Sequence, residues 1–285
     1  MGMDVLMGPV TSQPTEAVAE LTAKEGMPLV TATATMASIT KDRDNVFRTC
    51  YTDPFQGEVL AKYVANSRNM KKVAVMYNTS SDYSDGVATA FRAKCEELGV
   101  EVVANEGYAA TDKDFNTQLT KIAATKPEAL IVTDYYSSSI LIASQARNMG
   151  IEVPMIGPDG FDGILTVVDE ANKDITNNMF FANHYFVGSD EENVKNFVTA
   201  YKAKYNEEPN SFAAGAYDAI YLIADAMERA GSTDKAAVIE AIRASDFDGV
   251  AGHITYKNSG DPVKSVYILE IKDGAYKLVD TIKGE

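Results

Sequence analysis

Residues 71–103 read KKVAVMYNTSSDYSDGVATAFRAKCEELGVEVV, and this stretch decides the fold class. The apolar run at 73–77 is typical of a buried strand, and a helix is expected over 83–98. Gly99 ends that helix, and a second strand is expected at 101–103. A strand, a crossover helix and a second strand in this order form the repeating unit of a parallel sheet with right-handed connections.

The same alternation continues on both sides of this unit. Further strands are expected at residues 5–7, 29–31, 46–51, 130–133, 154–157 and 179–181. Further helices are expected at 15–24, 57–69, 115–125, 138–149 and 163–170. Ser12 is expected as the N-cap of the first of these helices, with Pro14 in its first turn. Such alternation predicts an α/β protein built on doubly wound parallel sheets.

The last hundred residues have a different pattern. Long helices are expected at 191–205, 211–230 and 235–244, and strands at 253–256, 265–271 and 276–282. Lys272-Asp273-Gly274 is a strong hairpin signal between the last two strands. The sequence therefore predicts two α/β blocks, helices that return after the second block, and a terminal antiparallel ribbon.

The charge balance argues against several classes of partner. The 285 residues include 26 Lys and Arg against 41 Asp and Glu, which leaves a net charge of −15. This acidic surplus argues against binding to nucleic acid and against docking to an anionic membrane by charge. No run approaches the roughly 20 apolar residues of a membrane-spanning helix, so direct membrane insertion is not expected. No secretory signal is expected within this sequence, because no basic region precedes the first apolar segment.

Signatures of catalysis and of metal binding are not found in the sequence. There is no G-x-S-x-G elbow, no Walker loop and no G-x-G-x-x-G behind a strand. The two histidines, His184 and His253, are isolated, and no CxxC spacing occurs. Cys50 and Cys95 are interpreted as buried free thiols, although one disulfide stays open as an alternative. The prediction is a protein that is not an enzyme and has no metal or cofactor.

Polar groups follow the predicted strands of the first block. In open α/β sheets, ligands bind outside the carboxyl ends of the strands. At these ends the first block places Ser12, at a helix N-terminus, and the threonines Thr33 and Thr35. Hydroxyls and backbone N–H donors at a helix N-terminus suit a carboxylate. The alternative interpretation is that Ser12 is only a helix cap.

The second block carries aromatic and acidic groups at the corresponding ends. Tyr83, Tyr135 and Asp159 follow three of its predicted strands. These residues offer aromatic walls and an acid that could hold an ammonium group. An anion site on one block and a cation site on the other suit a zwitterion held between them. The alternative is that the tyrosines are ordinary half-buried surface and that Asp159 is a turn residue.

Nine short motifs lie in order along the whole chain. They are GPVTS (8–12), GMPLV (26–30), NVFRT (45–49), TDPFQG (52–57), YSDG (83–86), QARNMG (145–150), GPDG (157–160), GHITY (252–256) and NSGDP (258–262). This series resembles the leucine/isoleucine/valine-binding protein family, which are type I periplasmic substrate-binding proteins of branched-chain amino acid ABC transporters. No single motif is diagnostic, but their order is.

The resemblance implies a set of ligand-binding residues. It implies that the ligand carboxylate is bound by Ser12 and the backbone near Thr35, and the amine by the Thr33 carbonyl, the Thr35 hydroxyl and Asp159. It further implies that Tyr83 and Tyr135 close over the ligand and that Phe212 is another aromatic wall. Relatives of the leucine-binding type carry Glu where this chain has Asp159, which is one methylene shorter. The amine contact is therefore expected to be direct, water-bridged or suited to a ligand of different size.

The resemblance also implies two lobes and a hinge. Lobe one is expected at residues 1–52 plus 185–262, and lobe two at 53–184 plus 263–285, with three chain crossings between them. Family members begin with two further strand–helix units before the strand at 5–7, which corresponds to roughly 60–70 residues. Lobe one is therefore expected to be incomplete, with an exposed sheet edge through which the chain could associate with itself.

The function implied by the resemblance is reversible capture of a small aliphatic, branched-chain L-amino acid in the cleft between the lobes. Delivery to the membrane permease of an ABC transporter would follow. The expected location is periplasmic or extracellular, with a lipid anchor compatible with a full-length protein. Two other classes stay open: a sensory ligand-binding module of the same fold for amides or other small metabolites, and, more distantly, an enzyme on a Rossmann-like scaffold.

Overall fold

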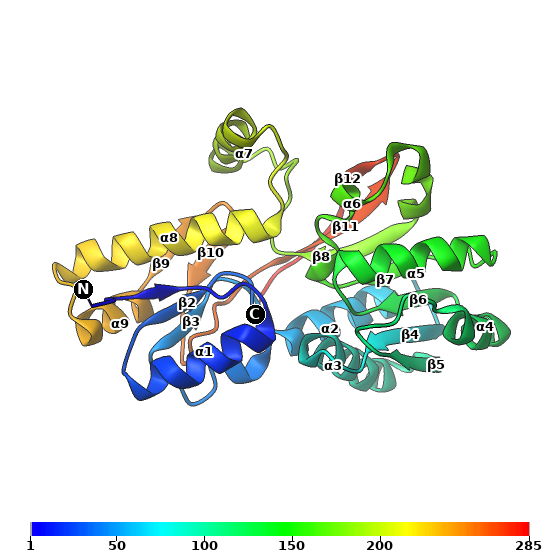
Figure 1. Cartoon of the computed structure of the whole chain (residues 1–285), viewed down its shortest axis with the longest axis horizontal. Coiled ribbons are helices and arrows are strands. Elements are labelled where there is room, and N and C mark those ends of the chain that lie inside the picture. Colours follow the sequence, from blue (N-terminus) through cyan, green and yellow to red (C-terminus); the bar gives the residue numbers. More distant parts are fainter. Residues whose placement is uncertain (1, 285) are drawn as a thin grey trace. The chain divides into compact units, whose positions relative to one another are not determined.

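The computed structural model describes residues 2–284 (Figure 1). The chain divides into two compact units, each with its own sheet. Unit 1 comprises the described residues within Met1–Thr52, His184–Ser265 and Lys283–Glu285. Unit 2 comprises Asp53–Asn183 and Val266–Ile282. Both units contain strands that alternate with helices, so the predicted α/β fold class with predominantly parallel sheets is confirmed.

Unit 2 is built on a seven-stranded sheet of order β12-β11-β8-β7-β6-β4-β5. Its parallel part consists of β4 (Lys72–Asn78), β5 (Glu101–Tyr108), β6 (Ala129–Val132), β7 (Met155–Gly157) and β8 (Met179–Asn183). The antiparallel hairpin of β11 (Val266–Lys272) and β12 (Ala275–Ile282) extends the sheet beyond β8. The strand order reverses between β4 and β6, which is the topological switch point of a doubly wound sheet.

Helices cover the sheet of unit 2 and leave its central strands without access to water. They are α2 (Asp53–Lys62), α3 (Asp82–Leu98), α4 (Asn116–Thr125), α5 (Tyr136–Asn148) and the short α6 (Ile164–Val167). A π-helical turn, Tyr63–Ser67, follows α2, and 3-10 turns occupy Asp159–Phe161 and Glu170–Thr176. All four residues of β6, Ala-Leu-Ile-Val, are buried, as expected for a parallel strand covered on both faces.

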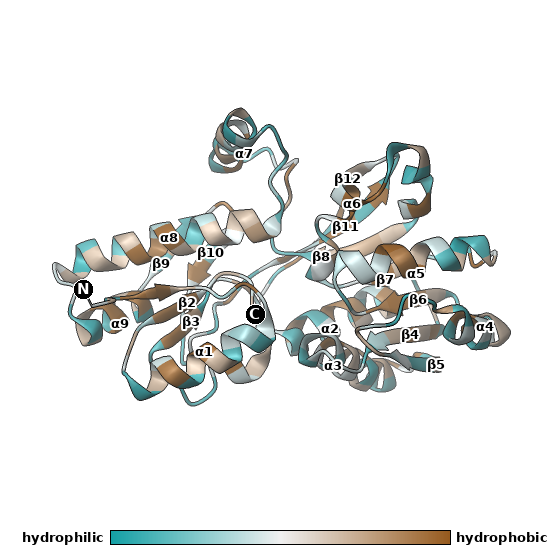
Figure 2. Cartoon of the chain, viewed as in Figure 1, coloured by the Kyte–Doolittle hydropathy of each residue, from teal (hydrophilic) through white to brown (hydrophobic). Residues whose placement is uncertain are grey.

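Unit 1 has a three-stranded parallel sheet of order β1-β2-β3. The strands are β1 (Leu6–Met7), β2 (Leu29–Thr31) and β3 (Val46–Arg48), and a separate antiparallel hairpin joins β9 (Asp246–Gly249) to β10 (Gly252–Thr255). The helices are α1 (Ser12–Lys24), α7 (Glu192–Tyr205), α8 (Ser211–Ala230) and α9 (Lys235–Arg243), with a 3-10 turn at Ala37–Ile39. The strands β1 and β2 are largely hydrophobic (Figure 2).

The core of unit 1 joins the sheet to α8 and α9. Val30 and Phe47 from the sheet pack in one buried cluster with Leu222 of α8, Ile242 of α9 and Ile254 of β10. Asn210 caps the N-terminus of α8 by accepting the backbone N–H of Ala213, and Gly231 ends the helix. The helix predicted at 211–230 is confirmed.

Several predicted elements differ from the structure. Thr11, and not Ser12, is the N-cap of α1, so Ser12 is the first helical residue. The helix predicted at 57–69 begins at Asp53, because Pro54 is tolerated in the first turn, where no intrahelical N–H bond is made. The helix predicted at 163–170 is limited to α6 and a 3-10 turn. Strand β9 was not predicted; its Asp-Phe-Asp-Gly alternation is stabilised by pairing with β10.

Candidate functional site

Three sequence-predicted residues of unit 2 meet at the carboxyl ends of its parallel strands. Tyr83 lies in the first turn of α3, after β4; Tyr135 is the N-cap of α5, after β6; and Asp159 begins the 3-10 turn after β7. The strands β4 and β6 flank the switch point, where doubly wound sheets bind their ligands. The local fold thus places an acid and two phenols at the edge where sheets of this type bind ligands.

Direct contacts join these residues. The Tyr83 hydroxyl donates a hydrogen bond of 2.7 Å to Oδ1 of Asp159 and accepts one of 3.0 Å from the backbone N–H of Gly160. The rings of Tyr83 and Tyr135 are stacked, with 4.6 Å between centroids. Asp159 is only 3% exposed. Its carboxylate is therefore held in one orientation, and charge-assisted bonds of this kind are the strong ones.

The environment keeps the Tyr83 hydroxyl protonated. Burial, followed by the nearby charge of Asp159, raises the pKa of Tyr83 well above its ordinary value of 10. Tyr83 is therefore a hydrogen-bond donor to Asp159 throughout the physiological pH range.

Gly160 permits the close approach of these groups. A Cβ atom added at Gly160 would lie 2.7 Å from the Tyr83 hydroxyl and 3.0 Å from the Asp134 carbonyl oxygen. Neither neighbour is a flexible chain end, so a side chain at this position would separate Tyr83 from the turn that carries Asp159. This contact explains the last glycine of the GPDG motif at 157–160.

Sequence reasoning missed a second layer of buried polar residues. Asp134 accepts hydrogen bonds from the Tyr108 hydroxyl (2.7 Å), from the Asn78 side chain (3.2 Å) and from the backbone N–H of Tyr135 (2.8 Å). These bonds fix the backbone from which Tyr135 projects. The signal was present in the sequence, because Asp134 comes directly after a predicted strand and directly before Tyr135.

The predicted residues of unit 1 also lie together. Ser12, Thr33 and Thr35 are all buried. The Ser12 hydroxyl accepts a 3.3 Å hydrogen bond from the backbone N–H of Met36, and the Thr33 hydroxyl donates one of 2.7 Å to the Val10 carbonyl. The loop after β1 is thereby fastened to the loop after β2, next to the first turn of α1.

Arg48 at the end of β3 holds the loop that contains Thr35. Its guanidinium is fully buried and donates to the carbonyls of Ala34 (2.8 Å) and Met36 (2.9 Å) and to the Thr40 hydroxyl (3.0 Å). Its Nε forms a 2.7 Å ion pair with Asp261. The planar fork of arginine suits such a set of fixed acceptors. No sequence motif indicated this role.

Phe212, the remaining predicted site residue, lies in the first turn of α8 in unit 1 and is half-buried. The N-terminal part of α8 approaches the loop after β2. A Cβ added at Gly215 would lie 3.1 Å from the Ala32 carbonyl and 3.4 Å from the Thr33 methyl group. The predicted site residues thus fall into two groups, with Ser12, Thr33, Thr35 and Phe212 in unit 1 and Tyr83, Tyr135 and Asp159 in unit 2.

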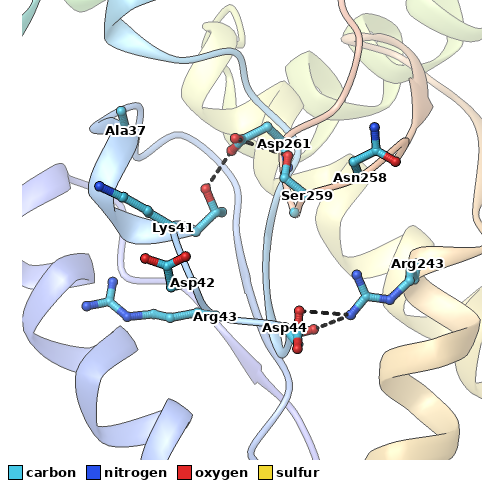
Figure 3. Close-up of a pocket in the computed structure, with 11 residues that line it drawn as sticks. Ala37, Lys41, Asp42, Arg43, Asp44, Arg243, Asn258, Ser259 and Asp261 are labelled. Atoms are coloured by element: carbon cyan, nitrogen blue, oxygen red, sulfur yellow. Dashed lines mark hydrogen bonds and ion pairs between the residues drawn. The ribbon is translucent and has the colours of Figure 1, made fainter.

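Other candidate sites in the described residues have weaker chemistry. A cavity of about 440 Å³ in unit 1 is lined by loop residues 37 and 40–44, by 258–261 and by Arg243 (Figure 3). Its charges are balanced, and two of them are held by neighbours: Arg243 donates a 2.7 Å hydrogen bond to the Asp44 carbonyl, and Asp261 accepts one from Thr40. This lining selects neither an anion nor a cation.

Metal and thiol chemistry receive no support from residues 2–284. No cluster of three or more His, Cys, Asp or Glu side chains in this range is arranged to bind a metal ion. Cys50 and Cys95 are both buried, and no disulfide joins them. Burial raises the pKa of the Cys95 thiol to about 12, which makes it a poor nucleophile.

Comparisons with known proteins place the chain in one family. The family model for periplasmic binding proteins matches residues 1–275. A Leu/Ile/Val-binding protein from Rhizobium johnstonii, BraC3, is 32% identical over 263 residues, which cover 91% of this chain and 70% of that protein. A leucine-, isoleucine-, valine-, threonine- and alanine-binding protein from Pseudomonas aeruginosa is 29% identical and is covered to 69% of its length.

Solved structures of similar amino acid-binding proteins superpose closely on this chain. The branched-chain amino acid transporter substrate-binding protein LivJ from Streptococcus pneumoniae, in complex with isoleucine, superposes with a TM-score of 0.91 at 34% identity. The alignment covers 99% of this chain and 80% of that one. The leucine-binding protein LivK from Thermotoga maritima gives a TM-score of 0.91 at 32% identity and is covered to 79%.

Proposed function

The chain belongs to the periplasmic binding protein family, and we propose that it captures a small aliphatic, branched-chain L-amino acid for delivery to an ABC transporter. One observation carries this proposal. A buried acid, Asp159, is oriented by Tyr83 at the switch point of unit 2. A carboxylate held in this way suits the ammonium group of an amino acid.

The carboxylate end of the ligand is assigned to unit 1. Ser12 and the backbone near Thr35 lie beside the first turn of α1, a helix of 13 residues. The N-terminus of such a helix carries partial positive charge and free N–H donors, which favour an anion. The Thr33 carbonyl and the Thr35 hydroxyl complete the amine end in this proposal, and Phe212 contacts the side chain.

We propose that both groups of residues contact one bound ligand molecule. The lobes would be residues 1–52 with 185–262 and residues 53–184 with 263–285, connected by three crossings that act as a hinge. A ligand that contacts both lobes stabilises the closed form over the open one. A micromolar dissociation constant corresponds to about −8 kcal/mol, which two charge-assisted anchors and one buried aliphatic side chain can supply.

The proposed role fixes the expected partners and location. Handover to a membrane permease, outside the cytoplasm, is what a substrate-binding protein of this kind requires, and a lipid anchor on a longer form is compatible with it. Catalysis is not part of the proposal, since the relatives found are substrate-binding proteins. Among the helices described, none combines the length and the apolar character needed to cross a bilayer.

Calorimetry tests the ligand class directly. Titration of the protein with L-leucine, L-isoleucine and L-valine is expected to give saturable binding, and Asp159→Ala is expected to abolish it. Leucinamide is the critical comparison, because it keeps the amine and lacks the carboxylate. Equal affinity for leucine and leucinamide would favour the sensory module for amides, and unchanged affinity in Asp159→Ala would refute the amine assignment.

Self-association of the chain is a second proposal, on unit 1. Among the described residues, β1 pairs with β2 alone, so its other edge carries unpaired backbone groups. Helix α8 buries one face in unit 1, yet Ile220 and Tyr221 on its other face are each 52% exposed. Large apolar side chains gathered on an exposed face often mark an interaction surface. The proposed contact is between these surfaces on two copies of the chain.

Analytical ultracentrifugation tests this proposal. A dimer that dissociates on dilution is expected, and Ile220→Lys is expected to shift the protein to monomer. The matched control is Leu278→Lys, an exposed apolar residue of β12 in unit 2, which should leave the dimer intact. A monomeric wild-type protein with a sharply cooperative melt would contradict the proposal.

A further inference from the structure

Gln56 lies behind Asp159 and was not among the predicted site residues. It is in the first turn of α2 and is fully buried. Its side-chain Oε1 accepts a 3.2 Å hydrogen bond from the backbone N–H of Asp159, and its Nε2 donates one of 3.1 Å to Oδ1 of Asp53. Both ends of the amide are therefore used, and all three residues belong to unit 2.

The chemistry of the two partners fixes the orientation of the Gln56 amide. The backbone N–H of Asp159 needs an acceptor, and the Asp53 carboxylate needs a donor. A flipped amide would place NH₂ against N–H and oxygen against oxygen. Asp53 is 1% exposed, so a lost hydrogen bond there is not replaced at low cost by water. The Gln56 side chain thus links α2 to the turn at Asp159–Phe161 in a fixed orientation.

Asp159 is consequently held at two points. Gln56 holds its backbone, and Tyr83 holds its side chain through the 2.7 Å bond to Oδ1. The N–H of Asp159 stands at the start of a 3-10 turn, where the turn itself offers no acceptor. Gln56 therefore determines where the Cα of Asp159 lies, whereas Tyr83 determines where the carboxylate points.

We propose that Gln56 is a positioning residue for the amine end of the ligand, acting through the backbone of Asp159. This inference rests on the proposed function, and it adds a residue that decides recognition of the amine without contacting the ligand. An aspartate has few torsions with which to correct a displaced backbone, so the position of its Cα sets the distance from carboxylate to ammonium. Misplacement of a binding group by about 1 Å is costly.

The test is Gln56→Met, which removes both hydrogen bonds and keeps a side chain of similar length. Binding of L-leucine and of 4-methylpentanoate, its analogue without the amine, is measured by calorimetry at ligand concentrations up to the millimolar range. The affinity for leucine is expected to fall by about tenfold or more, which is about 1.4 kcal/mol or more. The affinity for 4-methylpentanoate is expected to change by less than about twofold, because its recognition does not use Asp159.

Gln145→Met is the matched control. Gln145 is also in unit 2, and its amide also joins two groups: Oε1 accepts from the Phe115 N–H at 2.7 Å, and Nε2 donates to the Lys113 carbonyl at 2.8 Å. Its bonds involve neither Asp159 nor Tyr83, so both ligands should bind as to the wild-type protein. Equal losses for leucine and 4-methylpentanoate in Gln56→Met, or an equal loss of leucine affinity in Gln145→Met, would overturn the inference.

A second measurement separates this inference from the proposed function. Hydrogen exchange, followed by mass spectrometry of peptides that span residues 157–161, is expected to become about tenfold faster in Gln56→Met and to stay unchanged in Gln145→Met. Unchanged exchange in Gln56→Met overturns the inference whatever the ligand results. A wild-type protein that binds no amino acid refutes the proposed function and the amine-end role, while faster exchange would still show that Gln56 holds the turn.

Discussion

The two units solve the same problem, holding polar groups at the end of a parallel sheet, with different chemistry. Unit 2 uses a buried acid, a phenol and a carboxamide around the switch point of a seven-stranded sheet. Unit 1 uses neutral hydroxyls next to a helix N-terminus, on a sheet of three strands. From this difference we propose that unit 2 discriminates between ligands by charge and geometry, whereas unit 1 binds the ligand carboxylate mainly through backbone donors. The predictions below test that division.

The largest effect is expected from Arg48→Met in unit 1. Arg48 is fully buried and bonded to Ala34, Met36 and Asp261, so its removal leaves buried acceptors without donors. Each buried acceptor that is left without a donor costs about 1–3 kcal/mol. Urea unfolding, with alkylation of Cys50 in unit 1 and Cys95 in unit 2 detected by mass spectrometry, should show Cys50 becoming reactive at lower urea.

The control is Arg92→Met in unit 2, whose side chain bonds Asn105 and Thr89 at the surface. This change is expected to cost less than about 0.5 kcal/mol. If Arg48→Met cost no more than Arg92→Met, unit 1 would not depend on its buried guanidinium.

Alkaline pH is expected to weaken unit 2 more than unit 1. Burial raises the pKa of Tyr83, Tyr108 and Tyr276 in unit 2, and of Tyr256 in unit 1, above the ordinary value of 10. Above pH 10 the unfolded tyrosines lose protons that the folded ones keep, so stability is full below pH 10 and is lost as the pH rises. Each such tyrosine contributes about 1.4 kcal/mol per pH unit.

Urea unfolding between pH 9 and 11, again with the two cysteines as probes, measures this difference. The midpoint for Cys95 should fall more steeply with pH than the midpoint for Cys50. Tyr276→Phe should reduce the pH dependence of the Cys95 midpoint and leave that of the Cys50 midpoint unchanged. Parallel slopes for the two thiols would show that the units do not differ in this respect.

A smaller effect is expected from Tyr83→Phe. The change removes the hydrogen bond to Asp159 and keeps the ring stacked on Tyr135. A hydrogen bond to a charged group is worth about 1.5–3 kcal/mol, so leucine affinity in calorimetry should fall by about tenfold to a hundredfold. Tyr77→Phe, on a ring that faces Arg92, should leave the affinity unchanged. A Tyr83→Phe protein with wild-type affinity would mean that Asp159 needs no orientation by the phenol.

The smallest effect is expected from Ser12→Ala in unit 1. Backbone donors remain when the hydroxyl is lost, so leucine affinity should fall by about fivefold, near 1 kcal/mol, and leucinamide affinity should not change. Ser38→Ala, which removes a surface hydroxyl bonded to Glu16, is the control. Equal losses for leucine and leucinamide would place Ser12 away from the carboxylate.

The fold was largely predictable because its signals are local. Apolar runs such as β6 and the capped helix α8 have their periodicity and their end signals within the segment itself. Strand β9 was missed because its stability comes from pairing with β10 and not from its own composition. Ser12 was taken as the cap of α1 because Thr11 and Ser12 are both good cap residues, and the sequence does not choose between them.

The sequence indicated that the candidate residues follow the strand ends, but it did not indicate the bonds between them. Asp159 and Tyr83 stood out because each follows a predicted strand, but the hydrogen bond between them joins positions 76 apart in the sequence. Gln56 was not considered because the helix was expected to begin at residue 57, whereas it begins at Asp53 and includes Gln56. Arg48 was hidden inside a strand, where its charge gave no hint of the carbonyl groups that it contacts.

The network around Arg48 has a consequence for the thermodynamics of capture. The segment with Ala34, Met36 and Thr40 is hydrogen-bonded to one buried guanidinium, and these bonds do not require a ligand. A loop that is already ordered forfeits little entropy on association, since each residue fixed from a flexible state costs about 1–2 kcal/mol. In unit 1, therefore, a small loss of loop entropy is expected to contribute to the affinity.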